Sequence, residues 1–161
     1  MVLAGAFALS VVSLANAADR ATESFMSDAI KGDLIKIELG QLAQQQGASQ
    51  DVKNFGQMLV KDHSEHKGKA EALARQLGVT PPTSAGFAPN AEYLKLKLLS
   101  TGQFDREFAR YRADDHMTDI DEYKKVAGRN GPTASFAKET LPTLEHHLQM
   151  AQSLQQKLAQ Q

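Results

Sequence analysis

The chain has 161 residues and no cysteine, and its 18 Lys and Arg residues almost balance 19 Asp and Glu residues, which gives a formal net charge of -1. The length suits one domain, and a hydrophobic fraction of 42% with 23% charged residues is typical of a globular protein. The absence of a net positive charge argues against nucleic acid as a partner. The lack of cysteine excludes disulfides and thiolate ligands, so any metal must be held by His, Asp and Glu side chains.

The first residues of the chain have the pattern of a secretory leader. Residues 2–14 are almost wholly apolar or small, and Ala15-Asn16-Ala17 follows them, which fits the small-x-small site of a signal peptidase. The apolar run is shorter than the about 20 residues that span a bilayer, so a cleaved leader is favoured over a membrane anchor. We therefore predict a signal peptide over residues 1–17 and a mature single domain over residues 18–161. We expect no transmembrane segment in the mature chain and a location in the periplasm or cell envelope.

Four segments of the predicted mature chain carry apolar residues at helical spacing. The first covers about residues 21–46, and the second runs from Ser49 or Gln50 to Gly78. An extended connection over residues 79–90 follows, because this stretch is rich in proline, glycine and serine.

The second half of the chain continues this helical pattern. The third helical segment covers residues 91–127 with a break expected near residues 100–102, and the fourth begins at Pro132. Pro142 should kink the last helix or mark a second start. No alternating strand pattern occurs, so the predicted fold class is all-α, a four-helix bundle.

Each predicted helix carries an acidic or imidazole group near its middle and beside its apolar stripe. Glu38, His63 and His147 lie three or four residues from apolar residues of their own helix. His116 lies eleven residues after Asp105, which places the two on one helix face. With a rise of about 1.5 Å per residue, all four mid-helix groups lie roughly 15 to 25 Å from the predicted turns. We therefore expect Glu38, His63, His116 and His147 to meet at one level of the bundle.

Two interpretations of such a centre remain open, and a third is that the side chains face solvent. Bundle interiors hold metal ions between His and carboxylate groups of facing helices, and the ion here would be Zn, Fe, Cu or Ni. A hydrogen-bonded polar network would have the same residue pattern, because buried polar groups need partners. Asp62, His66 and Asp105 are additional candidates as ligands or as partners of the ligands, and His66 is equally compatible with packing.

Several short motifs recur in a fixed order along the chain: Ile37-Glu38-Leu39-Gly40-Gln41-Leu42-Ala43, Asn54-Phe55, Lys61-Asp62-His63, Phe104-Asp105-Arg106, His116, Leu141-Pro142-Thr143-Leu144 and His146-His147-Leu148. With these motifs the chain resembles the bacterial family of domain of unknown function 4142 over roughly residues 25–154. The resemblance implies a ferritin-like fold and an exported protein, and it implies no established activity. A ferritin-like di-iron site needs Glu-x-x-His on two helices, and this sequence contains no Glu-x-x-His. A mononuclear site rich in histidine is therefore the expected form of any metal centre.

Three functional interpretations follow from these features. The leading one is a non-enzymatic, exported envelope or stress-related binding protein with a His and carboxylate centre. The second is a metal-dependent oxidoreductase or metal-storage protein in which the same residues are ligands. The third is a structural or partner-binding helical module without metal. No catalytic residue is assigned, since the chain has no Gly-x-Ser-x-Gly elbow, phosphate loop or dinucleotide fingerprint, and the sequence leaves protein partners and homo-oligomers undecided.

Overall fold

The computed structural model describes residues 7–86 and 90–160, with side chains described from Arg20 onward except that of Asn90. The described residues form five helices and no strand: α1 (Phe7–Gln46), α2 (Gln50–Gln76), α3 (Asn90–Lys97), α4 (Thr101–Ala127) and α5 (Pro132–Leu158). The all-α prediction is confirmed, and the break expected near residues 100–102 separates α3 from α4. The predicted signal peptide falls on residues 1–6, which lie outside the described residues, and on residues 7–17, whose side chains are not described. It therefore stays a prediction.

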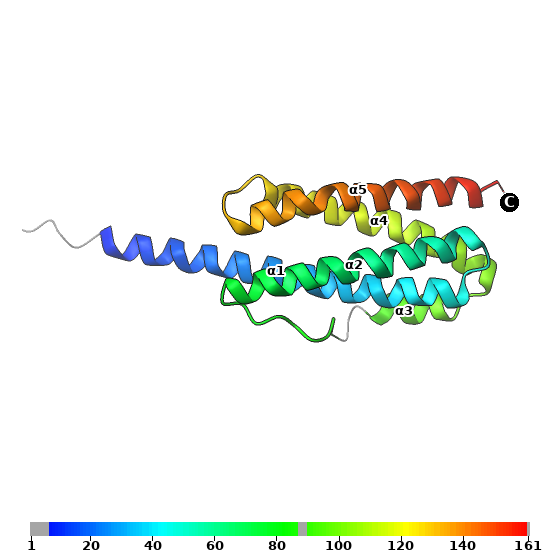
Figure 1. Ribbon diagram of the computed structural model, residues 1–161, viewed down its shortest axis with the longest axis horizontal. Helices are drawn as coiled ribbons and strands as arrows, with labels where there is room; N and C mark the ends of the chain where they lie inside the picture. Colours follow the sequence, from blue (N-terminus) through cyan, green and yellow to red (C-terminus); the bar gives the residue numbers. More distant parts are fainter. Residues whose placement is uncertain (1–6, 87–89, 161) are drawn as a thin grey trace, which may run out of the picture.

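The four long helices form a bundle of two hairpins that lie side by side (Figure 1). α1 packs against α2, and α4 packs against α5. The segment between α2 and α4 contains α3 and returns along the bundle, so that α4 runs in the same direction as α2. The connection between the two hairpins is therefore a crossover, a point that the sequence left open. Within the described ranges, every helix is too short or too polar to cross a membrane.

Local chemistry accounts for the ends of the helices. The side chain of Ser49 caps α2 by accepting a hydrogen bond from the backbone N–H of Val52 at 3.3 Å. α2 stops before Gly78, whose φ of 76° favours glycine. Pro132 occupies the first turn of α5, where its missing N–H costs nothing. α5 continues through Pro142, so no second helix starts there.

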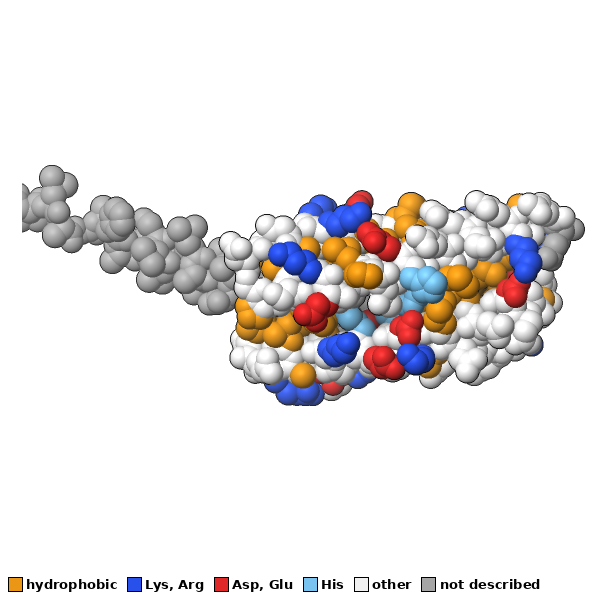
Figure 2. Space-filling model, turned by 45° about the horizontal axis from the view of Figure 1, so that its top comes forward, with side chains coloured by type: hydrophobic (Ala, Val, Ile, Leu, Met, Phe, Trp, Pro, Cys, Tyr) orange, Lys and Arg blue, Asp and Glu red, His pale blue; other side chains and the backbone are white. Residues whose placement is uncertain are grey.

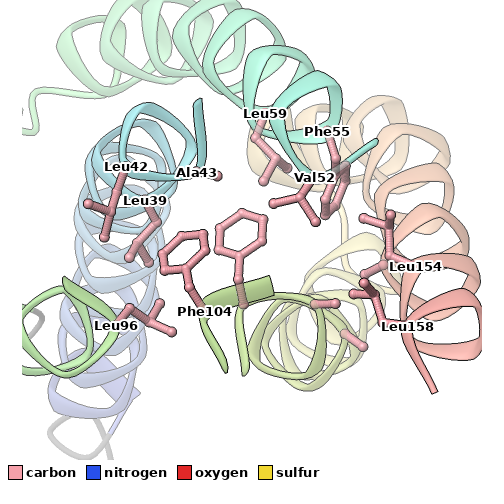
Figure 3. Packing of buried hydrophobic residues seen from close by; sticks show 14 residues of the cluster. Leu39, Leu42, Ala43, Val52, Phe55, Leu59, Leu96, Phe104, Leu154 and Leu158 are labelled. Atoms are coloured by element: carbon pink, nitrogen blue, oxygen red, sulfur yellow. The ribbon is translucent and has the colours of Figure 1, made fainter. Parts of the chain in front are cut away.

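Two apolar clusters fill the bundle, and a polar layer separates them. The first cluster lies near the α1–α2 turn, and in Figure 3 the side chain of Phe104 lies at its centre among residues of α1, α2 and α5. The second cluster lies toward the α4–α5 turn and includes Met26, Ile30, Ala70, Ile120, Phe136 and Leu144. Along each long helix, buried polar residues stand between the two clusters: Asp33 and Lys36 in α1, His63 in α2, Arg112 and His116 in α4, and His147 in α5. The fold therefore places one polar layer at mid-bundle.

A close approach of two glycines sets the register between α1 and α2. A Cβ atom added to Gly40 would lie 2.7 Å from the carbonyl oxygen of Gly56, and one added to Gly56 would lie 2.6 Å from the carbonyl oxygen of Gly40. Only glycine permits this spacing. Asp33 lies seven residues before Gly40 and His63 lies seven residues after Gly56, about two turns away on each antiparallel helix. The glycine contact therefore brings Asp33 opposite His63.

Candidate metal centre

Three histidines, one each from α2, α4 and α5, meet in the polar layer. The ring centroids of His63 and His147 are 5.1 Å apart, those of His116 and His147 are 5.3 Å apart, and those of His63 and His116 are 5.8 Å apart. All three side chains are buried. One nitrogen in each ring has no hydrogen-bond partner: Nε2 of His63, Nε2 of His116 and Nδ1 of His147. One potential ligand atom from each residue lies within 4.8 Å of the others. We call these three residues the histidine triad.

The second nitrogen of each triad ring faces a group that can only accept a hydrogen bond. His63 Nδ1 donates to Asp33 Oδ1 at 2.8 Å, His116 Nδ1 donates to the carbonyl oxygen of Arg112 at 2.7 Å, and His147 Nε2 donates to Asp62 Oδ2 at 3.0 Å. In a neutral imidazole one nitrogen carries the proton and the other carries a lone pair. The acceptors therefore hold the protons on the outer nitrogens and leave lone pairs on the three inner ones. The same arrangement orients histidines that bind metals.

Burial keeps the three triad rings neutral. It lowers the pKa of His63 from 6.5 to about 4, although the hydrogen bond to Asp33 opposes this change. Burial also lowers the pKa of His116 well below its ordinary value, and the positive charge of Lys36 lowers it further. The pKa of His147 is lowered by burial as well. At neutral pH the triad therefore presents three uncharged imidazoles, the form that binds a metal ion.

Asp33 holds two histidines of α2 at once. Its Oδ1 accepts the bond from His63, and its Oδ2 accepts one from His66 Nδ1 at 2.7 Å. Burial alone would raise the pKa of Asp33, but the hydrogen bonds from the two histidines hold this pKa below its ordinary value. His66 Nε2 lies 3.1 Å from Thr140 Oγ1. Because both nitrogens of His66 are hydrogen-bonded, His66 supports Asp33 and is not placed as a ligand.

A second set of charges lies between α1 and α4, with the cations Lys36 and Arg112 buried and their carboxylate partners half-buried. The ammonium of Lys36 contacts Asp115 at 3.1 Å and Asp119 at 2.8 Å, and Arg112 Nη1 donates to Asp115 at 3.3 Å. Burial would lower the pKa of Lys36, but the two carboxylates raise it above its ordinary value. The positive charges of Lys36 and Arg112 both lower the pKa of His116, so this set of charges helps to keep the triad neutral.

Comparison with known proteins places the chain in a family. Residues 10–154 match a family described as a domain of unknown function (DUF4142). The chain belongs to the DUF4142 family. No curated protein and no solved structure matches it significantly. The resemblance found in the motifs is thus confirmed.

One predicted member of the centre is placed elsewhere. Glu38 was expected to point inward from the first helix, but its side chain is exposed. The acidic residue that α1 contributes is Asp33, which was not among the predicted site residues. In this half of α1 the buried residues include Met26, Ile30 and Asp33, whereas Ile35, the apolar residue three positions before Glu38, is half-buried. The spacing of three residues between Ile30 and Asp33 was the signal that could have identified Asp33.

Asp105 also lies away from the histidine triad. Its Oδ1 accepts from the backbone N–H of Ala48 at 2.8 Å, and its Oδ2 accepts from that of Ser49 at 2.9 Å. The carboxylate therefore binds the α1–α2 turn at one end of the DUF4142 bundle. Asp62 lies beside the triad, as expected, but both of its described partners, His147 and Lys61, are hydrogen-bond donors. It orients His147.

The spacing of the triad nitrogens is close to that of a metal site. Three nitrogens at about 2.0 to 2.1 Å from a zinc ion are separated from one another by about 3.3 to 3.6 Å. One ring nitrogen of each triad residue lies within 4.8 Å of the others, so ring movements on the order of 1 Å would bring three nitrogens into coordination distance. Bundle side chains reach this adjustment by small changes in χ angles. The residues present therefore fit a single ion held by three imidazoles.

Proposed function

We propose that this DUF4142 protein binds one transition-metal ion through Nε2 of His63, Nε2 of His116 and Nδ1 of His147. The observation that carries the proposal is the convergence of three buried histidine rings, each with one nitrogen that makes no hydrogen bond to the described part of the chain. A self-satisfied hydrogen-bond network needs a donor for every acceptor. The inner nitrogens of the three rings make no hydrogen bond to a described residue, and one cation would use all three lone pairs.

The donor set narrows the class of metal. Neutral imidazoles suit Zn, Cu, Ni and Fe. Mg and Ca are disfavoured, because these ions prefer oxygen ligands. A di-iron centre needs bridging Glu residues, and the centre contains none. The carboxylates of Asp33 and Asp62 increase the basicity of His63 and His147 and so strengthen their bonds to an ion. A mononuclear site for a late first-row metal is the form that these residues support.

The proposed cellular role is metal binding or storage in the periplasm or cell envelope. Export rests on the leader pattern of residues 1–17. The single long crossover between two helical hairpins is the connectivity of ferritin-like bundles, and this supports the likeness that the family resemblance implied. A non-enzymatic binding protein remains the leading interpretation, with metal-dependent redox chemistry as its alternative.

Metal titration of the chelator-treated protein tests this proposal. Calorimetry and elemental analysis should give one equivalent of Zn²⁺ in the parent, and His116→Ala should abolish this binding. His146→Ala is the matched control, because His146 is an exposed imidazole next to His147 and should leave binding unchanged. At a free metal concentration of about 100 times Kd, binding should increase the free energy of unfolding by about 2.7 kcal/mol. Absence of binding for Zn²⁺, Cu²⁺, Ni²⁺ and Fe²⁺, together with destabilisation by His116→Ala, would instead indicate a structural polar network.

A further inference from the structure

A pocket leads from the surface to the histidine triad between α2 and α5. Its volume is about 170 Å³. The buried rings of His63 and His147 line its inner part, and the exposed side chains of Lys69 and Thr143 line its mouth. Figure 2 shows histidine side chains near the middle of one face of the bundle, bordered by acidic and hydrophobic side chains. Two of the three triad rings, His63 and His147, therefore border a pocket that opens on this side, and His116 lies deeper.

The described residues supply three ligands to the centre and no fourth. His63, His116 and His147 form the complete convergent group in the part of the chain that the structure describes. The neighbouring carboxylates are engaged elsewhere, because Asp33 binds His63 and His66, and Asp62 binds His147. Zinc and cobalt ions commonly take four ligands, and a site with three protein ligands keeps a position for an exogenous one.

We propose that the fourth position of the bound ion faces this pocket and exchanges water with small monoanions from solvent. The inference rests on the proposed metal site. A water molecule occupies about 30 Å³ in the liquid, so the pocket admits a small ligand with a few waters. It is smaller than the roughly 300 to 1,000 Å³ pockets that hold drug-sized molecules. Size therefore limits the ligand to a few heavy atoms.

Charge narrows the ligand class further. Three neutral imidazoles leave the full charge of a divalent ion in place, so the ion attracts an anion in its open position. The pocket lining contains the carboxylates of Asp62, Glu65 and Glu139, and Lys69 is its one cation of the Lys and Arg type. Such a lining favours entry of a metal cation and disfavours a polyanion such as phosphate. A small monoanion is attracted by the ion, and the carboxylates of the pocket repel it less than they repel a polyanion.

Cobalt substitution tests the open position separately from metal binding itself. Co²⁺ bound by the triad gives visible d–d bands, and azide entering the fourth position shifts them, whereas inorganic phosphate should not. Thr143→Trp should fill the pocket mouth and raise the apparent Kd of azide about tenfold, equivalent to about 1.4 kcal/mol. Thr118→Trp is the matched control, because Thr118 is an exposed threonine of α4 outside the pocket and should leave the azide response unchanged. Lys69→Trp blocks the mouth from α2 and replaces Thr143→Trp if that variant does not fold.

The outcomes separate the two proposals. Cobalt bands that appear and respond to azide, with a weakened response only in the pocket variants, support both. Bands that appear but never respond to azide overturn the open position and leave the metal site intact. An equal azide response in the parent and in the folded pocket variants overturns the route through this pocket. If the parent gives no cobalt bands and binds no metal, the metal site itself is refuted.

Discussion

Acidification from pH 7 to pH 5 should destabilise the metal-free protein, because the triad must stay neutral in the folded state. Burial lowers the pKa of His63 to about 4, while an unfolded histidine titrates near 6.5. Between these values the unfolded state binds more protons than the native state, so the free energy of unfolding falls as the pH falls. At pH 5 the loss from His63 alone is about 2 kcal/mol. His116, whose pKa is also lowered by burial, adds to it.

The pH range over which this stability is lost distinguishes the effect from acid denaturation caused by carboxylates. The loss from His63 ends near pH 4, where the folded ring itself takes up a proton. The pKa values of Asp33 and Asp62 are held below the ordinary value of 3.8, so these carboxylates add their own loss only at lower pH. Most of the change between pH 7 and pH 5 should therefore come from the buried histidines.

Urea unfolding in the presence of a chelator at pH 7, 6 and 5 measures this dependence. His63→Gln should flatten the dependence by about 2 kcal/mol over this range, because it removes the titrating group. His146→Ala should keep the parental slope, since His146 is exposed. A free energy of unfolding that stays constant or increases between pH 7 and pH 5 would refute the neutral burial of the triad.

Three further predictions concern the fold and are measured by urea unfolding of folded variants. Gly40→Ala should destabilise by about 1 to 3 kcal/mol because its Cβ meets the backbone of α2, whereas Gly68→Ala, with open space around it, should be neutral or stabilise by up to about 1 kcal/mol. Phe55→Ala should destabilise by about 3 to 5 kcal/mol because the ring is buried, and a loss below about 1 kcal/mol would contradict its place in the core. Asp105→Ala should cost about 2 to 3 kcal/mol by releasing the α1–α2 turn and should leave zinc affinity unchanged; a loss of zinc binding in the folded variant would restore Asp105 to the centre.

Local sequence patterns were sufficient for the helices and for the depth of the histidines. Helical periodicity located the long segments, and their ends carry side chains that cap or interrupt helices, such as Ser49, Gly78 and Pro132. Counting residues from the predicted turns placed His63, His116 and His147 at similar depth, since the rise per residue of an α-helix is constant. The structure brings these three rings together. These properties are local, because each depends on the geometry of one helix.

The partners of the triad depend on tertiary structure. The apolar spacing within α1 is compatible with either Asp33 or Glu38 beside the core, and the close approach of α1 and α2 at Gly40 accompanies the burial of Asp33 and the exposure of Glu38. The ring nitrogen that carries the lone pair likewise depends on a hydrogen-bond acceptor that the fold brings near. For His63 of α2, this acceptor is Asp33 of α1. A carboxylate by itself prefers an exposed face, since burial costs free energy unless a donor is present. Only the packed bundle supplies that donor, and for this reason the sequence located the histidines and Asp62 but not Asp33.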